Sequence, residues 1–228
     1  MFNIRFMGKF KDEDVLKQRP LPADAVPYQE GGLDDVIRKG FLLALPMLTV
    51  ILTIGILRYL QVRERMPGQP VQGIRAFFDA LTLNATELGV VNLVITVIMF
   101  LGLNFVLTIL HELIHAVAVP VRHEKQIWSH LDKGVLFVFF PEPVSRARFI
   151  VVSLAPNIVL AFVPWILLMV YAAELSTQAY WWIFIQVMLM AVGGIGDYAN
   201  TFHTLTQVPK NGRVHSYGVN SYWTADRS

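Results

Sequence analysis

The sequence contains no cysteine among its 228 residues. This absence excludes a disulfide framework, a metal site built on thiolates and a cysteine nucleophile. Any metal ion must therefore be held by histidine, aspartate or glutamate side chains. The segment before Gly40 also has no apolar core of the signal-peptide type, so we expect nothing to be cleaved from the N-terminus.

Charged residues are scarce. Lys, Arg, Asp and Glu make up 16% of the chain, whereas 54% of the residues are hydrophobic and the mean hydropathy is +0.49. This composition is too apolar for a soluble domain of this length, so the bilayer must be the solvent. The net charge of +2 and the pI near 8.9 are typical of the loop asymmetry of a membrane protein, and we expect no nucleic-acid partner.

Four stretches lack charged residues for long enough to cross a hydrocarbon core, which takes about 17 to 25 helical residues. They are residues 40–57, 88–110, 149–173 and 175–196. The sequence therefore predicts an all-α membrane protein with four transmembrane helices. The apolar run 134–140, closed by Pro141-Glu142-Pro143, predicts a small membrane-associated β segment between the second and third helices.

The distribution of Lys and Arg predicts the topology. We divide the chain into a cytosolic N-terminal segment (1–39), a four-helix transmembrane domain (40–206) and a cytosolic C-terminal tail (207–228). The prolines of the N-terminal segment predict an extended, irregular conformation there. With the N-terminus inside, the cytoplasmic segments contain 15 Lys and Arg and the outer segments contain 4. This bias predicts a multi-pass protein of the cell membrane with both termini in the cytoplasm.

The second apolar stretch runs into an HExxH motif, His111-Glu112-Leu113-Ile114-His115. Histidines four residues apart lie on one face of a helix and can bind one metal ion, which for this ligand set is Zn²⁺. Glu112 is placed beside them to act as the general base that deprotonates the attacking water. Random placement gives this pattern in about half a per cent of chains of this composition. The alternative is two interfacial histidines and a glutamate that reaches for water at a helix end.

A catalytic zinc site normally has a third protein ligand and an open position. The leading candidate is Asp197, which ends the fourth apolar stretch after three glycines that would let a neighbouring backbone approach closely. Counting 1.5 Å per residue puts His111 and Asp197 at a similar depth on the cytoplasmic side. Asp197 is otherwise an interfacial carboxylate at a helix end. The rival ligands are Glu142, Asn157, His203 and Glu174.

Other polar residues within the predicted helices have two interpretations each. Asn104 and Thr108 share the helix face of His111, and they either orient the ligands or form hydrogen bonds with a neighbouring helix. Pro156 frees a carbonyl group in the third helix. Asn157 either satisfies that carbonyl or binds the backbone of a substrate.

Several of these motifs together carry a resemblance to a known family. They are HELIHAVAVP at 111–120, the Phe-rich run before Pro141-Glu142-Pro143-Val144-Ser145-Arg146, Leu154-Ala155-Pro156-Asn157, and Gly196-Asp197. Over roughly residues 6–223 the sequence resembles the putative zincin peptidases, small bacterial membrane proteins that are in turn similar to site-2 proteases, the intramembrane zinc metalloproteases.

The resemblance implies that His111 and His115 are zinc ligands, that Glu112 is the catalytic base and that Asp197 is the third ligand. It also implies a bacterial source. The chain departs from the site-2 protease pattern in one respect, because no Leu-Asp-Gly follows an Asn-x-x-Pro within one helix. Asn157 and Asp197 lie on different segments instead.

These patterns predict a membrane-embedded zinc metallopeptidase that hydrolyses peptide bonds at or within the membrane. The expected partners are membrane lipid and a membrane-protein or peptide substrate. Two other classes of function use the same residues. One is a metal-binding membrane scaffold without catalysis, and the other is a small transporter that moves a cation or protons through the His/Glu/Asp cluster.

Overall fold

The structure is a computed structural model that describes residues 3–29, 32–67, 85–130 and 135–225. It is mostly helical, with 64% of the protein in helices. The chain divides into two compact units. Unit 1 comprises Met1–Ala44, Thr108–Pro156 and Gly194–Ser228, and unit 2 comprises Leu45–Leu107 and Asn157–Gly193.

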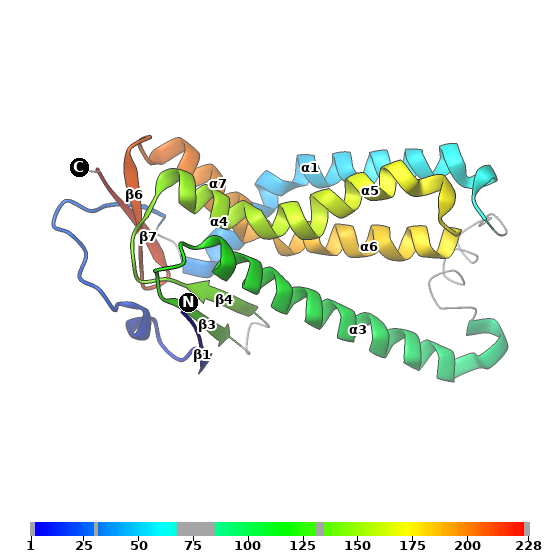
Figure 1. Cartoon of the computed structure of the whole chain (residues 1–228), viewed down its shortest axis with the longest axis horizontal. Coiled ribbons are helices and arrows are strands. Elements are labelled where there is room, and N and C mark those ends of the chain that lie inside the picture. Colours follow the sequence, from blue (N-terminus) through cyan, green and yellow to red (C-terminus); the bar gives the residue numbers. More distant parts are fainter. Residues whose placement is uncertain (1–2, 30–31, 68–84, 131–134, 226–228) are drawn as a thin grey trace. The chain divides into compact units, whose positions relative to one another are not determined.

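The apolar stretches of the sequence form the long helices of Figure 1. These are α1 (Gly32–Val62), α3 (Ala85–Ala118), the continuous run of α4 (Arg146–Asn157), η4 (Ile158–Phe162) and α5 (Val163–Tyr171), and then α6 (Thr177–Gly193) and α7 (Ile195–Gln207). Short helical turns form η1 (Glu13–Leu16), η2 (Arg63–Arg65) and η5 (Ala172–Glu174). Within the described residues, three helices are long and apolar enough to cross a membrane, or four if α6 and α7 form one bent span.

The predicted fourth helix is broken at Gly194. Helix α6 ends at Gly193 and α7 begins at Ile195, so Asp197 lies in the first turn of a separate helix rather than at the end of the fourth span. The backbone N–H group of Asp197 donates to the Gly194 carbonyl at 3.0 Å. A carboxylate in this first turn is favoured by the helix dipole.

Two of the three glycines near Asp197 lack the close approach that the sequence predicted. A Cβ on Gly193 would meet no described atom within 4 Å, and one on Gly196 would make ordinary van der Waals contact. The close approach in unit 1 occurs at Gly40 instead, where a Cβ would overlap the backbone of Ile195. Gly40 therefore allows α1 to pack against the start of α7.

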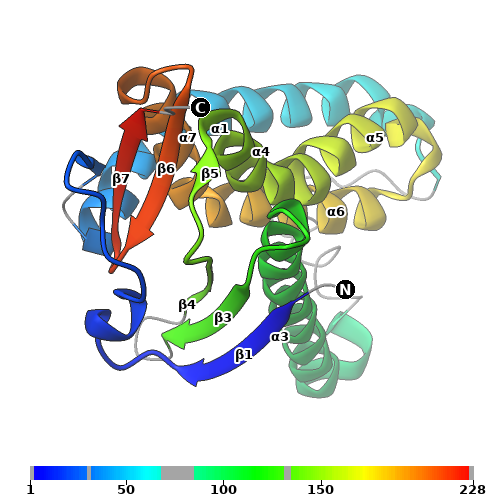
Figure 2. The ribbon, with the colours of Figure 1, turned by 60° about the vertical axis from the view of Figure 1, so that its left-hand side comes forward.

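The described part of unit 1 contains two small sheets (Figure 2). The first has the order β1-β3-β4, with β1 (Ile4–Lys9) parallel to β3 (Lys125–His130) and β4 (Val135–Phe139) antiparallel to β3. The second is antiparallel and has the order β2-β7-β6-β5, formed by β2 (Val26–Gln29), β7 (Asn220–Ala225), β6 (Gly212–Tyr217) and β5 (Val144–Ser145).

The β structure is larger than the sequence predicts. The expected segment between the second and third helices is present as β3, β4 and β5, but the N-terminal segment also supplies one strand to each sheet. The expectation of an irregular N-terminal segment is therefore wrong for β1 and β2, whereas residues 17–25 between them form neither helix nor strand. Strand β2 tolerates Pro27 because it is an edge strand, where one side of the backbone needs no partner.

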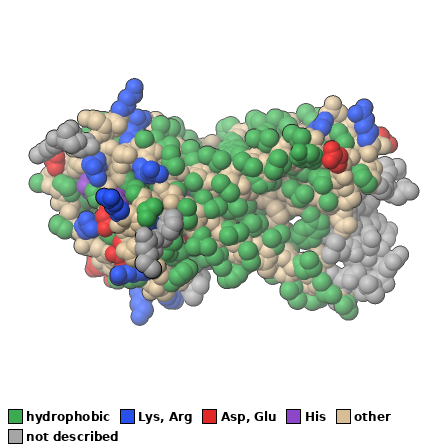
Figure 3. All heavy atoms as spheres, viewed as in Figure 1, with side chains coloured by type: hydrophobic (Ala, Val, Ile, Leu, Met, Phe, Trp, Pro, Cys, Tyr) green, Lys and Arg blue, Asp and Glu red, His purple; other side chains and the backbone are tan. Residues whose placement is uncertain are grey.

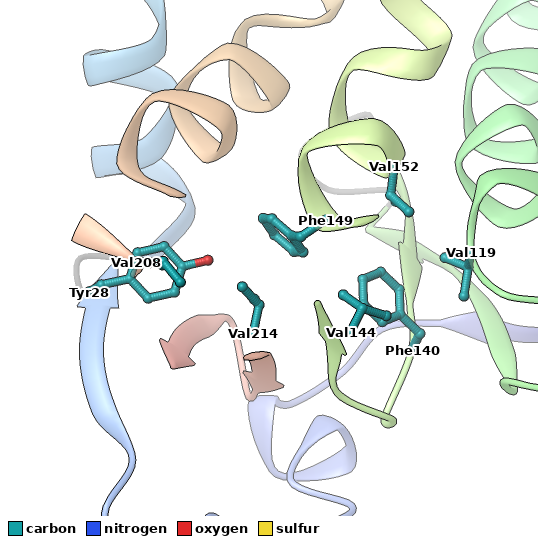
Figure 4. Packing of buried hydrophobic residues seen from close by; sticks show 8 residues of the cluster. All are labelled: Tyr28, Val119, Phe140, Val144, Phe149, Val152, Val208 and Val214. Atoms are coloured by element: carbon teal, nitrogen blue, oxygen red, sulfur yellow. The ribbon is translucent and has the colours of Figure 1, made fainter. Parts of the chain in front are cut away.

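A buried hydrophobic cluster in unit 1 joins the second sheet to α4 and to the residue after α3 (Figure 4). Its members are Tyr28, Val119, Phe140, Val144, Phe149, Val152, Val208 and Val214. The rings of Phe140 and Phe149 meet edge to face with centroids 6.3 Å apart. This packing fixes the first two turns of α4, whose backbone also contacts the residues of the HExxH motif.

Unit 2 consists of helices with apolar flanks, and its charged side chains gather at one end in Figure 3. Within it, the second half of α1 packs against α6 at Gly55, where a Cβ would overlap the ring of Phe184. The hydroxyl group of Tyr180 donates to the Gly55 carbonyl at 2.6 Å. This hydrogen bond and the missing side chain together hold the two helices at short range.

Candidate metal centre

The HExxH motif lies in the last two turns of α3, which continues to Ala118. His111 and His115 occupy the same face of the helix, and their ring centroids are 4.9 Å apart. The helical spacing predicted from the sequence is therefore present. The two rings are inclined at 77°, so they meet edge to face rather than stacking.

Asp197 of α7 meets both histidines. Nε2 of His111 lies 3.2 Å from Oδ2 of Asp197, and Nε2 of His115 lies 3.3 Å from Oδ1. All three side chains are at most 12% exposed. The structure thus brings together the three residues that the sequence predicted as ligands. They come from two helices, and Asp197 lies 82 positions after His115 in the sequence.

These separations fit a zinc ion. Ligand atoms about 2.0 to 2.2 Å from a tetrahedral metal lie about 3.3 to 3.6 Å from one another. The two nitrogen–oxygen separations at this site are 3.2 and 3.3 Å. Two imidazoles and one carboxylate are also a donor set that zinc accepts, with one position left open.

The hydrogen bond at Nδ1 of His115 fixes the tautomer of the neutral ring. Nδ1 of His115 lies 2.8 Å from the carbonyl oxygen of Val152. A carbonyl can only accept, so Nδ1 carries the hydrogen, and Nε2 of the neutral ring bears a lone pair. That lone pair faces an oxygen of Asp197 at 3.3 Å. Two acceptors this close repel each other unless a metal cation or an added proton lies between them.

The Val152 carbonyl is available because of Pro156. In an α-helix the N–H of residue 156 would donate to the oxygen of residue 152, and proline has no N–H. His115 takes that place. Asn157 belongs to unit 2 and is 1% exposed. Its role in substrate binding stays a prediction.

Glu112 is buried beside the histidines and is held by the first sheet. Its carboxylate accepts a hydrogen bond from the backbone N–H of Val138. This N–H is available because β4 is the edge strand of the order β1-β3-β4. His111, Glu112 and His115 each offer a ligand atom within 4.8 Å of the others. The sequence indicated a β segment here but gave no sign that it would hold the base.

Two rivals for the third ligand have other partners. Oε1 of Glu142 pairs with Arg19 at 2.7 Å, and its Oε2 accepts from the backbone N–H of Glu124 at 3.2 Å. Nδ1 of His203 lies 2.9 Å from the side-chain amide of Gln207. The other two rivals, Glu174 and Asn157, belong to unit 2, and Glu174 is an exposed residue of η5.

Two arginines of α4 hold the helices that carry the site. Arg146 donates to the carbonyl oxygens of Thr204 and Leu205 in the last turn of α7, at 3.3 and 2.9 Å. Arg148 donates to the carbonyl of Ala118 at the end of α3, at 3.4 Å. The last carbonyls of a helix have no intrahelical partner, so these contacts cap both helices.

The part of the chain that carries this site matches one protein family. Residues 104–212 match the family described as "Putative zincin peptidase". This match confirms the resemblance for that part of the chain. It covers the HExxH motif, Arg146 and Asp197, and it ends where β6 begins. Neither a curated protein nor a solved structure matches the chain.

Proposed function

We propose that this protein is a zinc-dependent peptidase that hydrolyses peptide bonds at or within the membrane. His111, His115 and Asp197 hold the zinc ion, and Glu112 is the general base. The observation that supports this most directly is the approach of both Nε2 atoms to the carboxylate of Asp197. With Nδ1 of His115 committed to a carbonyl, that arrangement favours a cation between the side chains.

Zinc bound at these residues supplies a Lewis acid that lowers the pKa of water and polarises the scissile carbonyl. The protein's own groups do the rest. Glu112 accepts a proton from the attacking water and returns it to the nitrogen of the leaving amine, so that the base is regenerated when the peptide bond has broken. The N–H of Val138 holds the carboxylate of Glu112 in place. The Val152 carbonyl holds the ring of His115.

The position of the site supports a substrate at the membrane. His111 and His115 lie within an apolar helix segment, Val94–Ala118, that is long enough to span a bilayer. Ionisable residues in such segments are costly and are kept where they have a function. We propose a membrane protein or a membrane-bound peptide as the substrate, with Asn157 as a residue that contacts its backbone.

A membrane scaffold without catalysis, with either zinc or a proton between these side chains, is the main competing explanation. A protonated His115 paired with Asp197 would satisfy the 3.3 Å separation between these two side chains. A transporter of cations or protons would use the same buried cluster. Metal content and turnover separate these alternatives, because only the peptidase needs both.

The test uses the full chain purified in detergent without chelators, with zinc measured by mass spectrometry and cleavage measured on β-casein as an extended probe. We expect about one zinc per chain in the wild type and in Glu112→Gln. We expect casein cleavage only in the wild type, with a loss of about 10² to 10⁴ in rate for the variant. His115→Ala should lose both zinc and activity.

Other results of this test would support a different function. Full zinc occupancy without cleavage in any variant would favour the scaffold. Zinc or proton flux into liposomes that Glu112→Gln abolishes would favour the transporter. An absence of zinc from folded wild-type protein would overturn the proposal.

A further inference from the structure

A groove lies on unit 2 between the end of α1 and the end of α5. Its volume is about 360 Å³, and it is lined by Ile54, Leu57, Arg58, Gln61 and Met169. The wall is apolar except for Arg58 and Gln61. The groove is far in sequence from the HExxH motif and uses none of the residues of the candidate metal centre.

The guanidinium group of Arg58 is fixed in this groove by two contacts. Its Nε donates to the carbonyl of Met169 at 2.9 Å, and Nη1 donates to Oε1 of Gln61 at 2.9 Å. Arginine has five N–H donors. Within the described part of the chain these two are the hydrogen bonds that Arg58 makes, so the remaining N–H groups, including both on Nη2, are available to an acceptor.

The first contact has a structural role of its own. Met169 lies in the last turn of α5, where carbonyl groups lack intrahelical partners, and Arg58 caps one of them. Capping requires one N–H and leaves the positive charge without a carboxylate partner among the described residues. A helix cap alone therefore does not account for a guanidinium group facing an apolar groove.

Several residues place Arg58 at the depth of lipid headgroups. It directly follows the first apolar stretch, and the exposed Leu57 before it covers the flank of the helix. Its other neighbour, Tyr59, packs against Tyr180 and Trp181 with ring centroids 5.6 and 4.9 Å apart. Tyrosine and tryptophan gather at the membrane–water interface because one end of each ring is apolar and the other polar.

We propose that this groove binds a membrane lipid with an anionic headgroup. The free N–H groups of Arg58 donate to the lipid phosphate, and an acyl chain lies along Ile54 and Leu57. Arginine suits this ligand because its planar fork forms two parallel hydrogen bonds with phosphate oxygens. The binding of this lipid is independent of the proposed peptidase activity and needs only insertion in a bilayer.

The rival explanation is general attraction of anionic lipid to the basic end of unit 2. Arg63 and Arg65 of η2 lie at the same end, with Glu64 and Glu174. In that case each arginine would contribute equally. A specific lipid site depends instead on Arg58 and on the open apolar wall beside it. Substitutions of single arginines therefore distinguish the two explanations.

The experiment counts lipids bound to the full chain by native mass spectrometry after release from micelles. The added lipids are dioleoyl phosphatidylglycerol and dioleoyl phosphatidylcholine, which share their chains and differ in net charge. We expect the wild type to bind phosphatidylglycerol about tenfold more tightly than phosphatidylcholine, because both offer the same phosphate oxygens but the choline cation repels the guanidinium group. Arg58→Gln should abolish this preference, and the matched control Arg65→Gln should keep it.

A second variant protects the test against misfolding of Arg58→Gln, which also loses the cap on α5. Leu57→Trp leaves the guanidinium group intact and fills the apolar wall at an exposed position, so it should lower phosphatidylglycerol binding without changing thermal stability. Inorganic phosphate at millimolar concentration should not compete, because it has no chain to bury. Equal losses in Arg58→Gln and Arg65→Gln, unchanged binding in Leu57→Trp, or no preference in the wild type would overturn the proposal.

Discussion

Pro156 and His115 are linked through a single carbonyl group. The oxygen of Val152, four residues before Pro156, accepts a hydrogen bond from Nδ1 of His115 at 2.8 Å. The proline removes the N–H that would otherwise compete for this oxygen. A residue outside the HExxH motif therefore sets the tautomer of a motif histidine, because the fixed hydrogen on Nδ1 leaves the Nε2 lone pair for the metal.

We expect Pro156→Ala to weaken zinc binding while the helix remains intact. Alanine restores the N–H that donates to Val152, so His115 must share the carbonyl or turn away from it. Loss of such a supporting contact typically costs about 10- to 100-fold in metal affinity. The zinc dissociation constant, measured by competition with a chromophoric chelator, should rise by about tenfold or more.

The matched control is Pro46→Ala, which removes the proline inside α1. It changes the helix backbone in the same way without a metal ligand at the freed carbonyl, so zinc affinity should stay at the wild-type value. Equal zinc affinity in Pro156→Ala and the wild type would show that the carbonyl of Val152 does not position His115.

The sequence predicted those features that depend on local spacing. The interval of four between His111 and His115 fixes their common face wherever the segment is helical. The long helices were also predictable, because a helix that crosses a bilayer must be apolar over a minimum length, and both properties can be read from the sequence. Asp197 was chosen for its charge at the end of an apolar stretch, and it lies in α7, just after the break at Gly194.

The features that were missed depend on contacts between distant segments. Nothing local shows that β1 pairs with β3, or that the C-terminal residues return to cover β2. The break at Gly194 was also missed, because glycine is common within membrane helices as well as at their ends. The contact of Val138 with Glu112 depends on where the edge of the first sheet lies, and the sequence pattern of a single strand does not predict that position.

Asp197→Asn tests the third ligand. The amide is nearly the same size but carries no charge, so it binds zinc less tightly than the carboxylate does. We expect lower zinc retention on purification, and we expect added zinc to restore part of the peptidase activity. Added zinc should not restore Glu112→Gln, whose defect is the missing base. Full metal content and full activity in Asp197→Asn would assign the third ligand to another residue.

Arg146→Gln tests whether the cap on α7 keeps Asp197 in place. The substitution removes two charge-assisted hydrogen bonds to the carbonyls of Thr204 and Leu205. Each such bond contributes about 1.5 to 3 kcal/mol at most, and partial exposure of this side chain reduces the value. We expect a lower midpoint of chemical unfolding together with weaker zinc binding.

The matched control for that variant is Arg148→Gln. Arg148 makes one longer contact, 3.4 Å to the carbonyl of Ala118, from an exposed side chain. Its loss should change both measurements less. If zinc affinity is the same in Arg146→Gln as in the wild type, the cap stabilises the fold without positioning the ligand.

Reporter fusions test the topology that the 15-to-4 distribution of Lys and Arg predicts. A fusion after Ser228 should be active only with a reporter that works in the cytoplasm. A fusion within 175–178, at the start of α6, should be active only with a reporter that works outside. The opposite pattern at both positions would place the HExxH end of α3 outside. If only the fusion after Ser228 disagrees and its external reporter is active, an even number of spans with the N-terminus inside is excluded.

Tyr28 gives the protein a defined sensitivity to alkaline pH. Burial raises the pKa of its phenol from 10.0 to about 12, although hydrogen bonds with Thr204 and Ser221 lower the pKa in part. The hydroxyl group lies 3.3 Å from Oγ1 of Thr204 in the core of unit 1. The folded state therefore favours the neutral phenol, whereas the unfolded chain releases the proton near the ordinary value.

The direction of the effect follows from proton binding in the two states. Below pH 10 the phenol is neutral in both, and the stability it contributes is fully present. Between about pH 10 and 12 the unfolded state binds fewer protons than the folded state, so the free energy of unfolding falls as the pH rises. A shift of about two units corresponds to a loss of about 2 to 3 kcal/mol by pH 12.

Tyr28→Phe removes both the hydrogen bond and the titration. At about pH 8 the variant should be less stable than the wild type by about 1 kcal/mol, the value of one buried hydrogen bond. As the pH approaches 12 only the wild type loses the contribution of this phenol, so the order of the two proteins should reverse. Denaturant unfolding followed by tryptophan fluorescence measures both free energies, and the other titrating groups cancel because the two proteins share them. A stability difference that stays constant from about pH 8 to 11.5 would show that Tyr28 ionises as readily in the folded protein as in the unfolded chain.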